Sequence, residues 1–271
     1  MKELTGTSSK EIRSHVQMPK SLLKRFQNTK NRFFYYDIRK KYVGTSGTAE
    51  SLNTERGYFS PEMEQYLSKK IEAPFGQILS VIDRIDFEQE CFLMPPDFEK
   101  LTKNFVYALM ARDPYEIENA NRDMFFSQIL FTKQMRHDYL TRRRIELANR
   151  KDFVSGFLLT FMVNKTDIPF VLPIAGIYGY QMGKYRMINL PVTPEIALCF
   201  VHIDDAGDLI IGENKISLWE VTSPVVIRKI NEKAFISQMK RNQGWVVCPY
   251  REELDRLKEK IQNGIDTGKL I

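Results

Sequence analysis

Hydrophobic residues recur at helical spacing through the middle of the first half of the chain. Ser60 followed by Pro61 is a typical helix start, because serine caps the free amides and proline suits the first helical position. The apolar positions that follow are three or four residues apart, which predicts a long amphipathic helix with an interruption or bend near Pro74. They are Met63, Leu67, Ile71, Phe75, Ile78, Leu79 and Ile82.

Two more helices are expected before the pattern changes. Asp97 follows two prolines and precedes an apolar series with helical spacing, which predicts a second helix that ends at Arg112 before Asp113 and Pro114. A third helical stretch is predicted from residue 116 to residue 150, where it ends in an arginine-rich turn.

Beyond residue 150 the pattern consists of short apolar runs between turn-forming residues, which predicts strands. The runs are 154–163, 168–172, 185–190, 196–202 and 209–211, and they are followed by a helix over 225–241, a strand over 245–248 and a helix over 250–263. Residues 204–208 read Asp-Asp-Ala-Gly-Asp, which predicts a hairpin turn rather than a calcium loop. Residues 32–38 suit a strand, and residues 44–57 read as a loop.

These elements predict an α+β fold in which the amino-terminal half consists mainly of long helices and the carboxy-terminal half of a mostly antiparallel sheet flanked by helices. A chain of 271 residues with 43% hydrophobic and 27% charged residues is long enough to bury a large core. No linker divides it. We therefore expect a single domain over residues 1–271, with a frayed tail over 1–10, a helical part over about 60–150 and a sheet-containing part over 151–271.

The charge balance favours anionic partners. The formal net charge is +6, and cations are concentrated in residues 10–41 and between Arg136 and Arg150. A solvated helix face is the plainer interpretation of any one such run. The three cysteines, Cys91, Cys199 and Cys248, are far apart and lack paired spacing, which argues against a disulfide framework and a zinc site and favours reduced thiols. We also expect no bound metal and no cofactor. No apolar stretch is long enough for a membrane span, and the expected location is cytoplasmic, with no membrane contact.

His15 is the first candidate functional residue, since it lies beside several cations. Imidazole titrates near neutral pH and can transfer protons, and Lys24, Arg25 and Arg32 could stabilise the charge of a phosphate. A histidine near a terminus is also often a surface or capping residue. Two interpretations therefore remain open for His15.

Glu64, Glu72 and Arg112 are weaker candidates. Glu64 and Glu72 are eight residues apart, which places them near one face of a helix, although exposed acids on a surface helix are commoner than a site. Arg112 is adequately explained as a helix end, and it could instead hold an anion in a cleft. His137, Asp138 and His202 are interpreted as structural, and no Walker A, GxGxxG, HExxH or GxSxG motif occurs.

Several segments resemble a widespread, mainly bacterial family, domain-of-unknown-function family four-two-three-eight. The resemblance spans about residues 15–257. It rests on short segments: Pro19, Leu23 and Phe26; Tyr35, Tyr36 and Asp37; Glu64 and Glu72; Phe105 through Arg112 to Pro114; Ile188 to Pro194; and Asn231. His15 lies four residues before Pro19, where the family commonly has histidine at three. A polar Asp-Asn loop of the family is replaced by Val171-Leu172-Pro173-Ile174-Ala175, so this chain could be inactive or use other groups. The resemblance implies no settled activity.

Two functions from different classes follow from these observations. The first is a protein that engages nucleic acid or another phosphate-bearing ligand, and its enzymatic form is a metal-independent nuclease of a bacterial phage-defence system. His15 and Arg112 would then be catalytic, and Lys24, Arg25, Arg32 and Asn231 would bind phosphate. The second is a non-catalytic interaction subunit, with a protein partner or a second copy of the chain, because 12% of the residues are aromatic.

Overall fold

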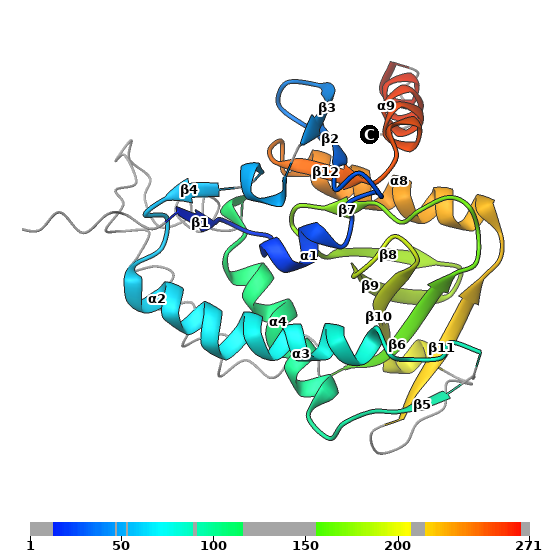
Figure 1. Ribbon diagram of the computed structural model, residues 1–271. Helices are drawn as coiled ribbons and strands as arrows, with labels where there is room; N and C mark the ends of the chain where they lie inside the picture. The colour runs from blue at the N-terminus through cyan, green and yellow to red at the C-terminus, as the bar shows by residue number, and fades with distance from the viewer. Residues whose placement is uncertain are drawn as a thin grey trace, which may run out of the picture.

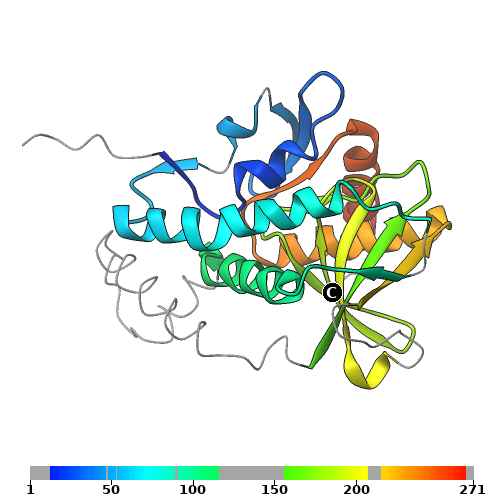
Figure 2. The same ribbon diagram turned by 60° about the horizontal axis from the view of Figure 1, so that its bottom comes forward.

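The computed structural model describes residues 13–46, 48–52, 54–88, 91–115, 156–206 and 215–266. The long helical part consists of α2 (Pro61–Tyr66), the π-helical segment η2 (Leu67–Glu72), α3 (Ala73–Ile82) and α4 (Phe98–Ala111). Figure 2 shows α3 and α4 side by side on one side of the molecule. The predicted third helix, with His137, Asp138 and the arginines of 136–150, lies outside the described residues.

The predicted interruption near Pro74 is confirmed, and it takes the form of a π-helical segment. Proline has no amide hydrogen and its ring crowds the preceding turn, so regular α-helical bonding cannot pass through it unchanged. The amide of Ala73 donates to the carbonyl of Ser68, five residues earlier. Such wider turns are rare and often lie at functional sites. Glu72 is the last residue of this one.

The amino-terminal cap of α2 gives a first testable prediction. Ser60 Oγ accepts a hydrogen bond from the amide of Met63 at 3.2 Å. Ser60→Ala leaves that amide without its partner and should lower the free energy of unfolding by about 1 kcal/mol in urea titrations. Ser80→Ala is the matched control, because Ser80 Oγ is exposed and only donates back to the carbonyl of Gly76. Equal stability of the two variants would contradict the assignment of the cap.

A six-stranded sheet forms the centre of the molecule in the order β5-β11-β6-β10-β9-β8. It is antiparallel except for the pair β11–β6, so the prediction of a mostly antiparallel sheet is confirmed. The strands are β5 (Cys91–Leu93), β6 (Phe157–Asn164), β8 (Tyr178–Met182), β9 (Tyr185–Pro191), β10 (Ile196–His202) and β11 (Lys215–Val221). Figure 1 shows this sheet beside α3 and α4.

Both faces of the six-stranded sheet are buried, which explains its continuous apolar runs. Successive residues of a strand point to opposite faces. Leu198 and Phe200 of β10 belong to one core, together with apolar residues of α3 and α4. Ala197 and Cys199 belong to a second core, with residues of α8 (Pro224–Lys240) and α9 (Arg251–Asp266). The sheet is therefore the middle of three layers.

A smaller sheet joins distant parts of the chain in the order β3-β2-β12-β7. Its strands are β2 (Phe33–Asp37), β3 (Tyr42–Ser46), β7 (Leu172–Pro173) and β12 (Trp245–Cys248), and α1 (Lys20–Lys24) precedes it. A two-stranded ribbon pairs β1 (Arg13–His15) with β4 (Thr54–Arg56), and a short helical turn, η1 (Ala49–Ser51), lies between β3 and β4.

The expectation that the amino-terminal half consists mainly of long helices is wrong. The described residues between 13 and 56 contain four strands, the short helix α1 and the helical turn η1, and the predicted loop over 44–57 includes the end of β3, η1 and β4. The composition of that loop misled because threonine suits strands as well as turns. Tyr35 of β2 and Tyr42 of β3 also make a contact across the hairpin, with Tyr35 Oη 2.9 Å from Tyr42 Oη.

Of the predicted hairpin turn over 204–208 and the strand over 209–211 that would follow it, only residues 204–206 are among the described residues. β10 lies between β6 and β9, whereas β11 lies beyond β6 and runs parallel to it. Residues 203–205 form the short helical turn η3 (Ile203–Asp205) after β10. Asp205 accepts hydrogen bonds from the amide and side chain of Arg186 on β9. These aspartates therefore hold a neighbouring strand.

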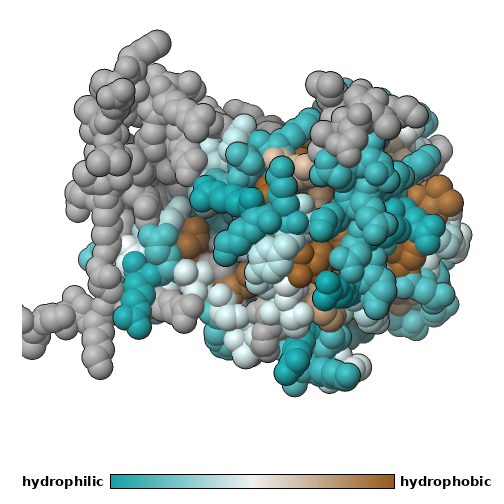
Figure 3. All heavy atoms as spheres, turned by 90° about the horizontal axis from the view of Figure 1, so that it is seen from above, coloured by the Kyte–Doolittle hydropathy of each residue, from teal (hydrophilic) through white to brown (hydrophobic). Residues whose placement is uncertain are grey.

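The outer surface over α9 is hydrophilic. Leu254, Leu257 and Ile261 of α9 are buried against the second core, and its charged residues face outward, as the view from above shows (Figure 3). No helix within the described ranges is both long and apolar enough to span a bilayer. Cys199 and Cys248 are buried free thiols whose pKa values burial raises above the usual range.

Candidate functional site

Arg112 is the most unusual side chain of the candidate site. It is the carboxy-terminal cap of α4, where a cation complements the negative end of the helix, and only 2% of its surface is exposed. Its Nη1 donates to Glu72 Oε1 at 2.8 Å. Its Nε and Nη2 are buried and have no hydrogen-bond partner in the part of the chain that the structure describes. A buried guanidinium stays charged, so these donors call for a further acceptor.

His15 lies close enough to this pair to interact with both members. It ends β1, where it is paired with Thr54, and its side chain is half-buried. Burial lowers the pKa of His15 from its ordinary value; the Glu72 carboxylate opposes this shift and the Arg112 guanidinium adds to it. Its Nδ1 is buried and has no hydrogen-bond partner among the described residues. A neutral imidazole thus lies beside an ion pair.

Glu72, Arg112 and His15 come from η2, α4 and β1, which are far apart in sequence. The π-helical segment before Pro74 places Glu72 at the end of a widened turn, opposite the end of α4. The site therefore combines a carboxylate, a buried cation and a group that can accept a proton. Such a set can bind an anion and move a proton beside it.

Glu64, the other predicted acid, does not share the ion pair. It lies on α2, and its Oε1 is buried without a hydrogen-bond partner among the described residues. Across those same residues no three histidine, cysteine, aspartate or glutamate side chains gather as metal ligands would. Glu64 is therefore a buried acceptor of unassigned role.

The amino-terminal cations differ in their surroundings. Arg25 is held by Asp83, with Nη1 3.0 Å from Oδ2, and its Nε donates to the carbonyl of Val192 at 3.0 Å. We assign Arg25 to the structure, because three of its nitrogens are engaged. Lys24 and Arg32 are exposed.

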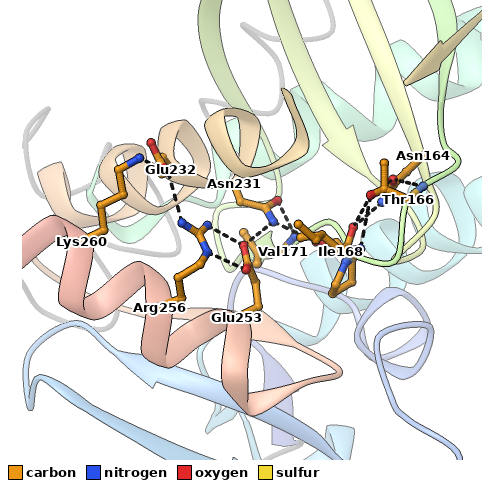
Figure 4. Close-up of polar contacts among 10 residues, drawn as sticks. Asn164, Thr166, Ile168, Val171, Asn231, Glu232, Glu253, Arg256 and Lys260 are labelled. Atoms are coloured by element: carbon orange, nitrogen blue, oxygen red, sulfur yellow. Dashed lines mark hydrogen bonds and ion pairs between the residues drawn. The ribbon is translucent and has the colours of Figure 1, made fainter. Parts of the chain in front are cut away.

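Asn231 is not part of the Arg112 site. It is fully buried on α8, where its Oδ1 accepts from the amide of Val171 at 3.1 Å and its Nδ2 donates to the carbonyl of Pro169 and to Glu253 Oε1. Glu253 also receives two hydrogen bonds from Arg256 on the same helix, α9. Figure 4 shows this network between α8 and α9, with Glu232 and Lys260 completing it. The amide serves as a structural link.

Sequence reasoning missed a second buried ion pair next to the site. Asp113 follows Arg112, and its Oδ2 accepts from Arg241 Nε at 2.7 Å. Arg241 is the carboxy-terminal cap of α8, so the ends of α4 and α8 are joined here. The only available signal was that each residue lies at the end of a predicted helix. That signal does not reveal which two ends meet.

The lowered pKa of His15 predicts a pH-dependent difference in stability. The folded state favours the neutral ring, so this contribution is fully present above the ordinary value near 6.5 and is lost as the pH falls below it. The charged groups around the ring are Glu72, Arg112, Lys20 and Glu50. Urea titrations between about pH 7.5 and 5.5 should show that wild type loses more stability than His15→Gln. Parallel curves for the two proteins would contradict a depressed pKa.

The site thus rests on the geometry of the chain itself. A scan of protein-family models, a search of curated proteins and a search of solved structures each found no match to this chain.

Proposed function

We propose that this protein binds a phosphate-bearing ligand, nucleic acid first of all, at Arg112, and that His15 serves as the proton-transfer group of a metal-independent phosphodiester cleavage. One observation carries the proposal. Only 2% of the surface of Arg112 is exposed, and its Nε and Nη2 donors have no hydrogen-bond partner among the described residues. Unsatisfied buried donors are costly, and their presence in a folded protein favours a ligand as acceptor.

The geometry of guanidinium supports a phosphate rather than a single acceptor. Nε and Nη2 lie on the same edge of the planar group and point the same way, whereas Nη1 faces the other side. Glu72 occupies Nη1 alone. The remaining edge presents two parallel N–H groups, which is the arrangement that binds two oxygens of a phosphate.

His15 is suited to accept a proton under these conditions. Burial lowers its pKa, so the ring is neutral near pH 7 and has a nitrogen lone pair available. In RNA, His15 would take the proton of the ribose 2'-hydroxyl as that oxygen attacks the neighbouring phosphorus. The P–O5' bond would break to leave a 2',3'-cyclic phosphate, and the departing 5'-oxygen would take up a proton from the imidazolium or from water. Arg112 would stabilise the negative charge that develops on the phosphate oxygens. Lys24 and Arg32, both exposed, would contact the flanking backbone.

Salt-dependent binding of oligonucleotides tests the proposal. Fluorescence anisotropy should detect binding of single-stranded RNA at about 50 mM salt and much weaker binding at about 200 mM. Arg112→Lys keeps the charge but removes the two-donor edge, so affinity should fall about tenfold, or roughly 1.4 kcal/mol. Arg228→Lys, an exposed residue of α8, is the matched control and should bind like wild type.

Cleavage is measured separately in the presence of a chelator. His15→Gln should bind RNA with nearly unchanged affinity and cut it about a hundredfold or more slowly. The proposal fails if wild type does not bind at low salt, or if Arg112→Lys and Arg228→Lys behave alike. Binding without any cleavage would remove the catalytic part and leave a phosphate-binding protein.

A further inference from the structure

A hollow of about 180 Å³ lies where the end of α4 meets β8, β9 and α8. Met110, Ile177 and Ile188 give it apolar walls, and Asp113 and Arg241 line its polar side. The hollow adjoins the end of α4 at Asp113, the residue after Arg112, yet Arg112 does not line it. It is therefore a separate site from the one proposed above.

The polar side of the hollow retains both an acceptor and a donor. Asp113 accepts from Arg241 Nε and from the amide of Tyr115, which leaves part of the acceptor capacity of its carboxylate unused. Arg241 Nη1 donates to the carbonyl and hydroxyl of Ser237. Its Nη2 has no hydrogen bond within the described part of the chain. A ligand in the hollow thus meets a carboxylate acceptor next to a guanidinium donor.

Charge and size restrict what this hollow can hold. Asp113 and Arg241 form an ion pair, so the polar side of the hollow has no net charge. It therefore favours a neutral ligand over an anion or a cation. A cavity of about 150 Å³ accommodates a single six-membered ring, and this one is slightly larger. It is smaller than the roughly 300 Å³ at which sites for larger organic ligands begin.

We propose that the hollow binds the base of a pyrimidine nucleoside. Such a base is a neutral, planar, single ring with a hydrogen-bond donor beside an acceptor. Its amino or imino donor would face Asp113, and the adjacent acceptor, ring N3 in cytosine or a carbonyl in uracil, would face Arg241. Its ring faces would contact Met110, Ile177 and Ile188. The inference does not depend on phosphate binding at Arg112, because a nucleoside carries no phosphate.

Gly179 offers a way to close the hollow with little disturbance of the fold. It lines the hollow on β8, directly opposite Ile188 of β9, so both residues face the same side of the sheet. A Cβ added at Gly179 meets only the carbonyl of Met187, at 3.7 Å, which is ordinary contact. Gly179→Leu should therefore fold and fill the space. Gly76→Leu on α3 is the matched control, since its added Cβ has open space.

Isothermal titration calorimetry of the full chain with cytidine, uridine and guanosine tests the proposal. Cytidine or uridine should bind one molecule per chain and more tightly than guanosine, whose base has two fused rings. Gly179→Leu should weaken pyrimidine binding at least tenfold, and Gly76→Leu should leave it unchanged. Asp113→Asn keeps the shape of the wall but removes its charge, and it should also weaken binding severalfold. Circular dichroism establishes that each variant is folded.

Three results would overturn the inference. The first is the absence of nucleoside binding up to about 10 mM, a very weak affinity. The second is unchanged binding in Gly179→Leu, or in Asp113→Asn should Gly179→Leu not fold. The third is binding of benzene as tight as that of cytidine, which would make the hollow an apolar void only. None of these results bears on the oligonucleotide assay with Arg112→Lys, so the two proposals fail independently.

Discussion

Asn231→Ala is expected to lower the free energy of unfolding by about 3–5 kcal/mol, because several buried groups lose their partners at once. The amide of Val171, the carbonyl of Pro169 and one bond to Glu253 depend on this side chain. Glu253 is itself 8% exposed, so its carboxylate cannot turn to water for a replacement. Each unpaired buried group costs about 1–3 kcal/mol.

Urea unfolding followed by circular dichroism measures this loss. Lys229→Ala, an exposed position on the same helix, should change stability by less than about 0.5 kcal/mol. At low temperature, where Asn231→Ala remains folded, its affinity for RNA should equal that of wild type. Weakened RNA binding with normal stability would instead return Asn231 to the phosphate-binding residues that the sequence suggested.

Glu72→Ala should destabilise the protein by about 3 kcal/mol, and added phosphate should restore part of that loss. Without Glu72 the guanidinium of Arg112 is left as a buried charge with no counter-ion, which is strongly destabilising. Glu72 is 32% exposed, so solvent reaches the site and the cost stays at the low end of the range for buried pairs. An anion that occupies the space of the carboxylate would pair with Arg112 again.

The rescue is measured as an increase in midpoint temperature with phosphate at constant ionic strength. A ligand at a hundred times its dissociation constant stabilises by about 2.7 kcal/mol. Glu88→Ala is the control, because Glu88 is 80% exposed and pairs with Lys165 at the surface; it should neither destabilise strongly nor respond to phosphate. If both variants respond equally, Arg112 holds no anion.

Local patterns predicted individual elements well where a buried apolar segment is bounded by turn-forming residues. The strands over 196–202 and 245–248 and the helix around 225–241 have nearly the expected bounds, because each is a dense apolar segment between turn residues. β8 was missed although Tyr178, Tyr180 and Met182 alternate along it. The two intervening residues, Gly179 and Gln181, are small or polar. The segment therefore has a period of two but no run of consecutive apolar residues, and it was the runs that were read as strands.

Pairing between distant segments could not be predicted in the same way. Nothing in the composition of β11 indicates that it runs parallel to β6 rather than back along β10. The candidate site depends on the same kind of information. His15, Glu72 and Arg112 were each identified separately, yet their meeting depends on how β1, η2 and α4 pack. Asn231 was grouped with them by resemblance, and its surroundings place it in the α8–α9 network instead.

The position of β12 in the smaller sheet has a consequence for biosynthesis. β2 emerges from the ribosome well before its partner β12, which pairs with it through Trp245 and Asp37 and follows it by roughly 200 residues. At about 5–20 residues per second, that delay is on the order of 10–40 s. During this time β2 and β3 form only a two-stranded hairpin, which is marginally stable in water. The nascent chain must therefore keep an aromatic strand edge unpaired until β12 has been translated, and chaperones could bind that edge during this interval.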